Sequence, residues 1–90
     1  MKFEYDINKS RINKEKHGID FVEAQNLWKD ENALIVPANT ADDELRYALI
    51  SFFNKKCFVA IFTIRETIFR IISVRRCRTN EEKNYDNNNK

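Results

Sequence analysis

Arginines are the most informative chemical groups in the last third of the sequence. Arg70 is the one charged residue in an otherwise apolar run, and Arg65 precedes that run. Three more follow it: Arg75, Arg76 and Arg78. Guanidinium groups bind phosphate through two parallel hydrogen bonds, so a cluster of them beside strands fits a nucleic-acid backbone. Alternatively, the last three form a solvated basic run or pair with the glutamates that follow.

Two side chains are candidates for proton transfer. His17 is the only histidine, between Lys16 and Gly18, and an imidazole exchanges protons readily near neutral pH. It can equally serve only to meet the dipole and terminal carbonyls of a helix. Tyr85 can offer a phenol to a scissile phosphate, or it can simply anchor the last helix.

These groups suit the cleavage of RNA without a metal or another cofactor. The sequence shows no acidic cluster suited to Mg²⁺ and no metal-ligand spacing. In RNA the ribose 2′-OH attacks its own phosphate while one group takes its proton, another protonates the leaving oxygen, and arginines stabilise the developing charge. DNA lacks this nucleophile, so the set favours RNA. The same residues are also compatible with other uses.

Charge is distributed unevenly along the 90 residues, although the net charge is only +2. Residues 18–44 carry −6, whereas residues 1–17 carry +2 and the two later segments, 45–64 and 65–90, each carry +3. The small net charge therefore hides an acidic middle between two basic ends.

Composition excludes several classes of protein. One glycine and one proline exclude Gly-rich phosphate loops. No stretch is long and apolar enough to span a membrane, and the N-terminus lacks a secretory h-region. Cys57 and Cys77 lack metal-site spacing, so we expect two reduced cysteines serving as small hydrophobes in a cytoplasmic protein.

The first part of the chain predicts a short strand and two helices. Residues 3–6 alternate like an edge strand. Asp6 can cap a helix over about 8–17 that ends at Gly18, with Ile7 and Ile12 as its core contacts. Asp20 and Glu23 resemble a capping box that opens a second helix over about 21–29. One face of it carries an apolar stripe: Phe21, Ala24, Leu27 and Trp28.

The rest predicts mainly strands. A short strand over 33–36 ends at Pro37, and 38–45 is a polar loop. Three antiparallel strands follow over about 46–53, 57–64 and 67–74, with apolar residues on both faces of the middle one. In the last strand Arg70 and Ile72 point one way, and Phe69, Ile71 and Ser73 the other.

Thr79 can cap a last helix through about Tyr85. The expected fold is therefore α+β, in the order β-α-α-β-β-β-β-α, with helices packed on one face of a mostly antiparallel sheet. We expect a single domain over 1–86 and a disordered Asn-rich tail over 87–90.

The polar positions of the sequence resemble the BrnT toxin family. Its opening motif is matched by residues 3–6, Lys9, Asn13, Lys16-His17-Gly18, Phe21, Glu23 and Ala24. A second motif is matched by Arg46, the run Arg70-Ile71-Ile72-Ser73-Val74-Arg75-Arg76, Glu81 and Tyr85. The resemblance implies a RelE-like fold and a ribonuclease toxin of a type II toxin–antitoxin pair that stops translation. It also implies neutralisation by a BrnA-like antitoxin with a ribbon-helix-helix DNA-binding domain, in a complex of two copies of each. This complex would repress its own operon, so the chain would reach DNA only through the antitoxin.

We therefore expect four catalytic candidates: His17, Arg70, Arg75 and Tyr85. The candidates for binding RNA are Lys14, Lys16, Arg46, Arg65, Arg76 and Arg78. Two other interpretations stay open. In one, the basic sheet face docks an acidic partner and the chain is a non-catalytic co-repressor; in the other, the strands only bind RNA.

Overall fold

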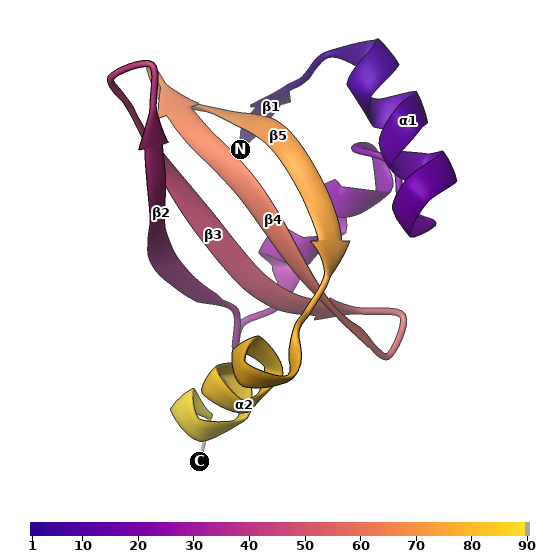
Figure 1. The fold of residues 1–90 in the computed structure, drawn as a ribbon, viewed down its shortest axis with the longest axis vertical. Helices are drawn as coiled ribbons and strands as arrows, with labels where there is room; N and C mark the ends of the chain where they lie inside the picture. Colours follow the sequence, from indigo (N-terminus) through magenta and orange to yellow (C-terminus); the bar gives the residue numbers. More distant parts are fainter. Residues whose placement is uncertain (90) are drawn as a thin grey trace.

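The computed structural model describes residues 1–89, and the side chain of Ala41 is not described within them. Figure 1 shows the elements in this order: β1 (Lys2–Glu4), α1 (Ile7–His17), η1 (Glu23–Lys29), β2 (Leu34–Ala41), β3 (Glu44–Phe53), β4 (Lys56–Arg65), β5 (Ile68–Arg76) and α2 (Thr79–Asn88). The expected α+β class and element order are confirmed, with η1 a 3₁₀ helix.

The sheet has five strands in the order β1-β5-β4-β3-β2. β1 runs parallel to β5, and the other neighbours are antiparallel. Three two-residue turns join the antiparallel strands: Asp42-Asp43, Asn54-Lys55 and Glu66-Thr67. Both residues of each turn have positive φ, which is the type I′ pattern that matches the twist of a hairpin.

The predicted loop after Pro37 is wrong, because β2 continues through Pro37 to Ala41. Pro37 is tolerated since β2 is an edge strand, where a missing N–H costs no ladder bond on the outer side. Asp42 and Asp43, whose φ values are 53° and 59°, then turn the chain into β3. Aspartate tolerates this conformation better than most residues, so Asp42 and Asp43 can form the turn of a hairpin between β2 and β3.

α1 lies beside β5, beyond the short β1 (Figure 1). Asp6 caps it by accepting hydrogen bonds from the backbone of Asn8 and Lys9, and Gly18 ends it with φ 75°, as predicted. The predicted core contacts are wrong, since Ile7 and Ile12 are exposed and the helix buries Ser10 and Asn13 instead.

Ser10 and Asn13 are buried because they satisfy backbone groups of neighbouring segments. Ser10 Oγ accepts from the backbone N–H of Phe21, and Asn13 donates to the carbonyl of Ile19 and accepts from the N–H of Val74. The hydrogen bond from the N–H of Val74 lies on the edge of β5 beyond the end of β1, where β5 has no neighbouring strand. α1 is therefore attached by polar contacts.

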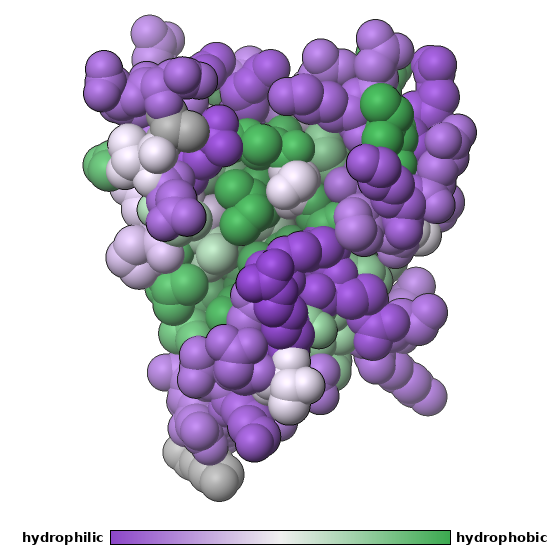
Figure 2. All heavy atoms as spheres, viewed as in Figure 1, coloured by the Kyte–Doolittle hydropathy of each residue, from purple (hydrophilic) through white to green (hydrophobic). Residues whose placement is uncertain are grey.

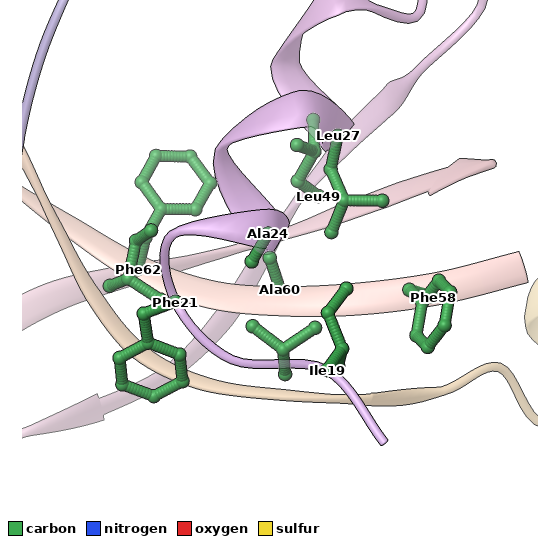
Figure 3. Packing of buried hydrophobic residues seen from close by; sticks show 10 residues of the cluster. Ile19, Phe21, Ala24, Leu27, Leu49, Phe58, Ala60 and Phe62 are labelled. Carbon is green, nitrogen blue, oxygen red and sulfur yellow. The ribbon is translucent and has the colours of Figure 1, made fainter. Parts of the chain in front are cut away.

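η1 covers one face of the sheet, and the main core lies beneath it (Figure 3). Phe21, Ala24 and Leu27 are fully buried against residues of β3, β4 and β5, which confirms the predicted apolar stripe. The capping box is also confirmed, because Asp20 and Glu23 each accept a hydrogen bond from the other's backbone N–H.

A β-bulge in β5 changes the expected facing of its residues. Phe62 pairs with Ile71, but the preceding Ile61 pairs with Ser73, so β5 holds one extra residue. Val74 therefore enters the core under η1, and Ser73 is exposed. The prediction that Ser73 faces with Ile71 is wrong, while Arg70 and Ile72 do line the same hollow.

α2 packs at one end of the opposite face, where the rings of Phe52 and Tyr85 lie 4.9 Å apart. The helix extends to Asn88, beyond the predicted end at Tyr85, and Asn89 follows as its cap. Of the predicted 87–90 tail, two residues are thus helical, and Lys90 lies outside the described residues.

The two cysteines form a disulfide, so the expected pair of reduced thiols is wrong. Cys57 opens β4 and Cys77 directly follows β5; the N–H of Cys77 donates to the carbonyl of Cys57, and their Cα atoms are 5.3 Å apart. The strand pairing thus brings two residues far apart in sequence within bonding reach.

Candidate functional site

We call the sheet face away from η1 the open face. Side chains alternate along each strand, so its members include Leu34, Val36, Ala38, Arg46, Ala48, Ile50, Val59, Ile61, Thr63, Arg70, Ile72 and Arg75. Figure 2 views this face and shows hydrophobic surface over its middle, surrounded by hydrophilic residues.

Three of the predicted arginines come together at one end of the open face. They line a hollow of about 290 Å³, which we call the arginine hollow. Its lining residues are Lys9, Asp42, Glu44, Arg46, Arg65, Arg70 and Ile72. The hairpin register brings Ala38 opposite Arg46 and Thr63 opposite Arg70. Four cations thus share this hollow with two carboxylates.

A second hollow adjoins the first and contains the only histidine. We call it the histidine hollow, and its lining residues are Lys9, Ile12, Asn13, Lys16, His17, Ile72 and Ser73. Lys9 and Ile72 belong to both hollows. The polar attachment of α1 to β5 therefore places the histidine hollow next to the arginine hollow, with Lys16 and His17 about two helical turns from the shared Lys9.

The arginines of the hollow differ in how strongly they are already paired. Arg65 holds Glu44 through two hydrogen bonds of 2.7 and 3.1 Å, and this contact lowers the pKa of Glu44. Arg70 approaches Glu4 only to 3.7 Å. Arg46 makes no hydrogen bond or ion pair with the described residues, and its Nε is buried without a partner. Arg46 and Arg70 are therefore the guanidinium groups most available to a ligand.

Arg75 lies at the other end of the open face and is already paired with a carboxylate. Its guanidinium forms two bonds of 2.8 Å to the Glu81 carboxylate, and it also donates to the carbonyl of Arg76. The hydrogen bond from Arg75 is the main cause of the lowered pKa of Glu81. The alternative of pairing with Glu81 is thus what the structure shows for Arg75.

Tyr85 lies with α2, apart from both hollows. Its hydroxyl donates to Asp30 Oδ2 at 2.8 Å. Burial, together with this bond, raises the pKa of Tyr85 to about 12. Burial opposes ionisation of Asp30, but hydrogen bonds from Asn32 and Tyr85 among others outweigh it and lower the pKa of Asp30. The phenol is therefore neutral at physiological pH.

The remaining predicted cations lie outside the two hollows. Lys14 pairs with Glu23 at 2.6 Å. Arg76 lies over the Phe58 ring, 5.6 Å from its centroid, and donates to the carbonyl of Cys57. Arg78 precedes α2 and donates its backbone N–H to Glu81.

Residues 1–89 contain neither a metal-binding cluster nor a membrane-spanning helix. No group of three or more histidine, cysteine, aspartate or glutamate side chains in that part of the chain is arranged to hold a metal ion. None of the helices there has the length and apolar character to cross a membrane.

Residues 5–81 match the family described as ribonuclease toxin, BrnT, of type II toxin-antitoxin system. This chain belongs to the BrnT family. The match covers both hollows and Arg75, and it ends before Tyr85. No curated protein matches the sequence. A type II toxin has a cognate antitoxin, and a ribonuclease toxin acts on RNA, so the partners of this BrnT chain are an antitoxin and RNA.

Sequence reasoning missed one residue that lines the two hollows. Lys9 belongs to the family motif but was not among the predicted RNA-binding residues, although it lines both hollows. Its position seven residues before Lys16, about two turns of α1, puts these two lysines on the same side of the helix. This spacing is a signal that identifies it.

Proposed function

We propose that the two adjoining hollows form the site at which this chain cleaves RNA without a metal ion. The observation that carries the proposal is that the arginine hollow and the histidine hollow share Lys9 and Ile72, so Arg46, Arg70 and His17 border two adjoining parts of one surface. An RNA strand that crosses both hollows would meet the weakly paired guanidinium groups of Arg46 and Arg70 with its phosphates and the imidazole of His17 with its ribose.

The reaction would be an in-line displacement at phosphorus. The ribose 2′-oxygen forms a bond to phosphorus as the bond to the 5′-oxygen breaks, which leaves a 2′,3′-cyclic phosphate and a 5′-hydroxyl. His17 takes the 2′-OH proton or protonates the leaving oxygen, and Lys16 or Lys9 assists. Arg46 and Arg70 stabilise the added negative charge on the phosphate.

We assign Arg65 to holding Glu44 and the edge of the hollow, and Arg75 and Tyr85 to holding α2. The latter two were predicted to be catalytic, and their bonds to Glu81 and Asp30 would have to break before either could touch substrate. Lys14, Arg76 and Arg78 would at most extend the basic surface along the RNA.

We also propose that the toxin acts in the cytoplasm, where it cleaves mRNA and inhibits translation. Its antitoxin would be BrnA-like, with a ribbon-helix-helix domain, in a complex with two copies of each chain. That complex would repress its own operon, and the chain would meet DNA only through the antitoxin.

Induction of the chain in bacteria, with mapping of RNA 5′ ends, tests this function. The parent should halt growth and create new 5′-hydroxyl ends, whereas His17→Ala and Arg70→Ala should do neither. Lys55→Ala, in the exposed β3–β4 turn, is the matched control and should behave like the parent. Growth arrest without new RNA ends would instead indicate the non-catalytic or RNA-binding alternative.

A further inference from the structure

The middle of the open face is aliphatic and only partly covered. Buried Ala48, Ile50 and Val59 form its base. Five partly exposed residues, which we call the aliphatic floor, surround them: Leu34, Val36, Ala38, Ile61 and Ile72. α2 covers only the end near Phe52 and Tyr85. The hydrophobic surface in the middle of Figure 2 is this face.

Arginines border the floor at both ends. Along β5, Ile72 lies between Arg70 and Arg75. Across β2 and β3, Ala38 pairs with Arg46, and the next open-face pair is Val36 with Ala48. The apolar surface therefore continues directly into the arginine hollow, with which it shares Ile72.

The chemistry of the floor fits a protein partner better than RNA. Bases bind to proteins mainly by stacking on aromatic rings, but the floor is aliphatic. Its apolar area is instead suited to the apolar side of an amphipathic segment, and carboxylates on that segment would meet the arginines. The charge and the apolar surface together favour an acidic amphipathic segment.

We propose that the cognate antitoxin neutralises this toxin by laying such a segment across the open face, with apolar side chains on the floor and carboxylates on Arg46 and Arg70. The inference rests on the proposed function, because the same two guanidinium groups are there assigned to the RNA phosphate. Carboxylate and phosphate both occupy the guanidinium fork, so the bound segment excludes RNA from the site.

Two neighbouring residues of β2 provide a matched test. Val36 faces the floor, whereas Ile35, which is 55% exposed, pairs with Leu49 and faces the η1 side. Val36→Glu should weaken binding of the purified cognate antitoxin at least about tenfold, since it places a charge in an apolar contact. Ile35→Glu should change affinity less than about twofold, because surface changes outside a contact are nearly neutral. Calorimetric titration measures both, and the parent affinity should fall as salt rises.

Thermal unfolding of each variant shows whether it is folded. If Val36→Glu is unfolded, Val36→Thr replaces it, with Ile35→Thr as control, and the same order of affinities is expected. Equal effects on the two faces, or no effect at Val36, would overturn the proposal. So would a Val36 variant that loses self-association or RNA binding while it keeps antitoxin affinity, since the occupant would then be a second copy or RNA.

Antitoxin affinity is measured without RNA, so the two proposals fail separately. A chain that cleaves no RNA but loses the antitoxin on Val36→Glu supports this docking surface and contradicts the proposed function. A chain that cleaves RNA but keeps its antitoxin affinity on Val36→Glu supports the proposed function and contradicts this docking surface.

Discussion

The hydroxyl of Tyr85 donates a hydrogen bond to Asp30 Oδ2 at 2.8 Å, and this bond fastens α2 to the turn that follows η1. Asp30 also accepts from Ser51 and from the backbone of Phe52, so one carboxylate joins three segments. α2 has no fully buried residue of its own. Its position on the sheet therefore depends on a few polar contacts, which single substitutions can test.

Removing the Tyr85 hydroxyl should affect stability and leave catalysis intact. Tyr85→Phe should lower the free energy of unfolding by about 1 kcal/mol, the usual value of a partly buried hydrogen bond. RNA cleavage should stay within about twofold, because a mutation away from the chemistry removes no transition-state contact. Tyr47→Phe, whose hydroxyl bonds to none of the described residues, is the control for urea unfolding. A large loss of cleavage at unchanged stability would make the phenol a catalytic group.

The Arg75–Glu81 pair should make stability depend on pH. The pKa of Glu81 is lowered in the folded chain, so the contribution is present above the ordinary glutamate pKa, about 4.3, and is lost as pH falls below it. Glu81→Gln should therefore cost about 1–2 kcal/mol at pH 7 and progressively less from pH 5 to pH 3. Unfolding of parent and variant across this range measures it. The exposed neighbour variant, Glu82→Gln, should show no such trend, and a pH-independent cost at position 81 would contradict the assignment.

Asn13 should be one of the most sensitive polar residues. Asn13→Ala leaves the N–H of Val74 and the carbonyl of Ile19 without partners in a buried place, which should cost about 3 kcal/mol. Urea unfolding gives the value, and Asn8→Ala, on the exposed first turn of α1, should cost less than about 0.5 kcal/mol. A small loss at Asn13 would mean that α1 is held to β5 by other contacts.

Reduction of the disulfide should lower stability without destroying the fold. Cys57 and Cys77 are 20 residues apart, and a closed loop of that length stabilises by about 3 kcal/mol. A dithiol such as dithiothreitol should therefore lower the free energy of unfolding of the parent. The double variant Cys57→Ala with Cys77→Ala should start lower and not respond to the reductant. An equal response in both would indicate that the bond contributes nothing.

Local sequence rules accounted for much of the fold. The caps at Asp6 and Gly18, the reciprocal Asp20–Glu23 pair and the stripe of η1 depend on near neighbours, so they were predictable. The exposure of Ile7 and the burial of Asn13 were not, because both follow from the meeting of α1 with β5. Long-range pairing also produced the disulfide.

The site was predictable in part for the same reason. Arg70 stood out as a charge within an apolar strand, and it does lie in a shared hollow with Arg46 and Arg65. The facing of Ser73 was missed because a bulge shifts the strand by one residue, which no local pattern indicates. The pairing of Arg75 with Glu81 was one of three interpretations that the sequence left open, because it depends on where α2 lies.

The central claim is that the 2′-OH of RNA is the nucleophile and that Arg70 stabilises the reacting phosphate without a metal. Its most direct measurement uses purified chain in EDTA with an oligonucleotide that contains one ribose in an otherwise deoxy strand. We predict cleavage only at that ribose, a 2′,3′-cyclic phosphate end, and a rate at least about 100-fold lower for Arg70→Gln, with Arg11→Gln on the exposed side of α1 unchanged. Cleavage of the all-deoxy strand, or cleavage that appears only when Mg²⁺ is added, would contradict it.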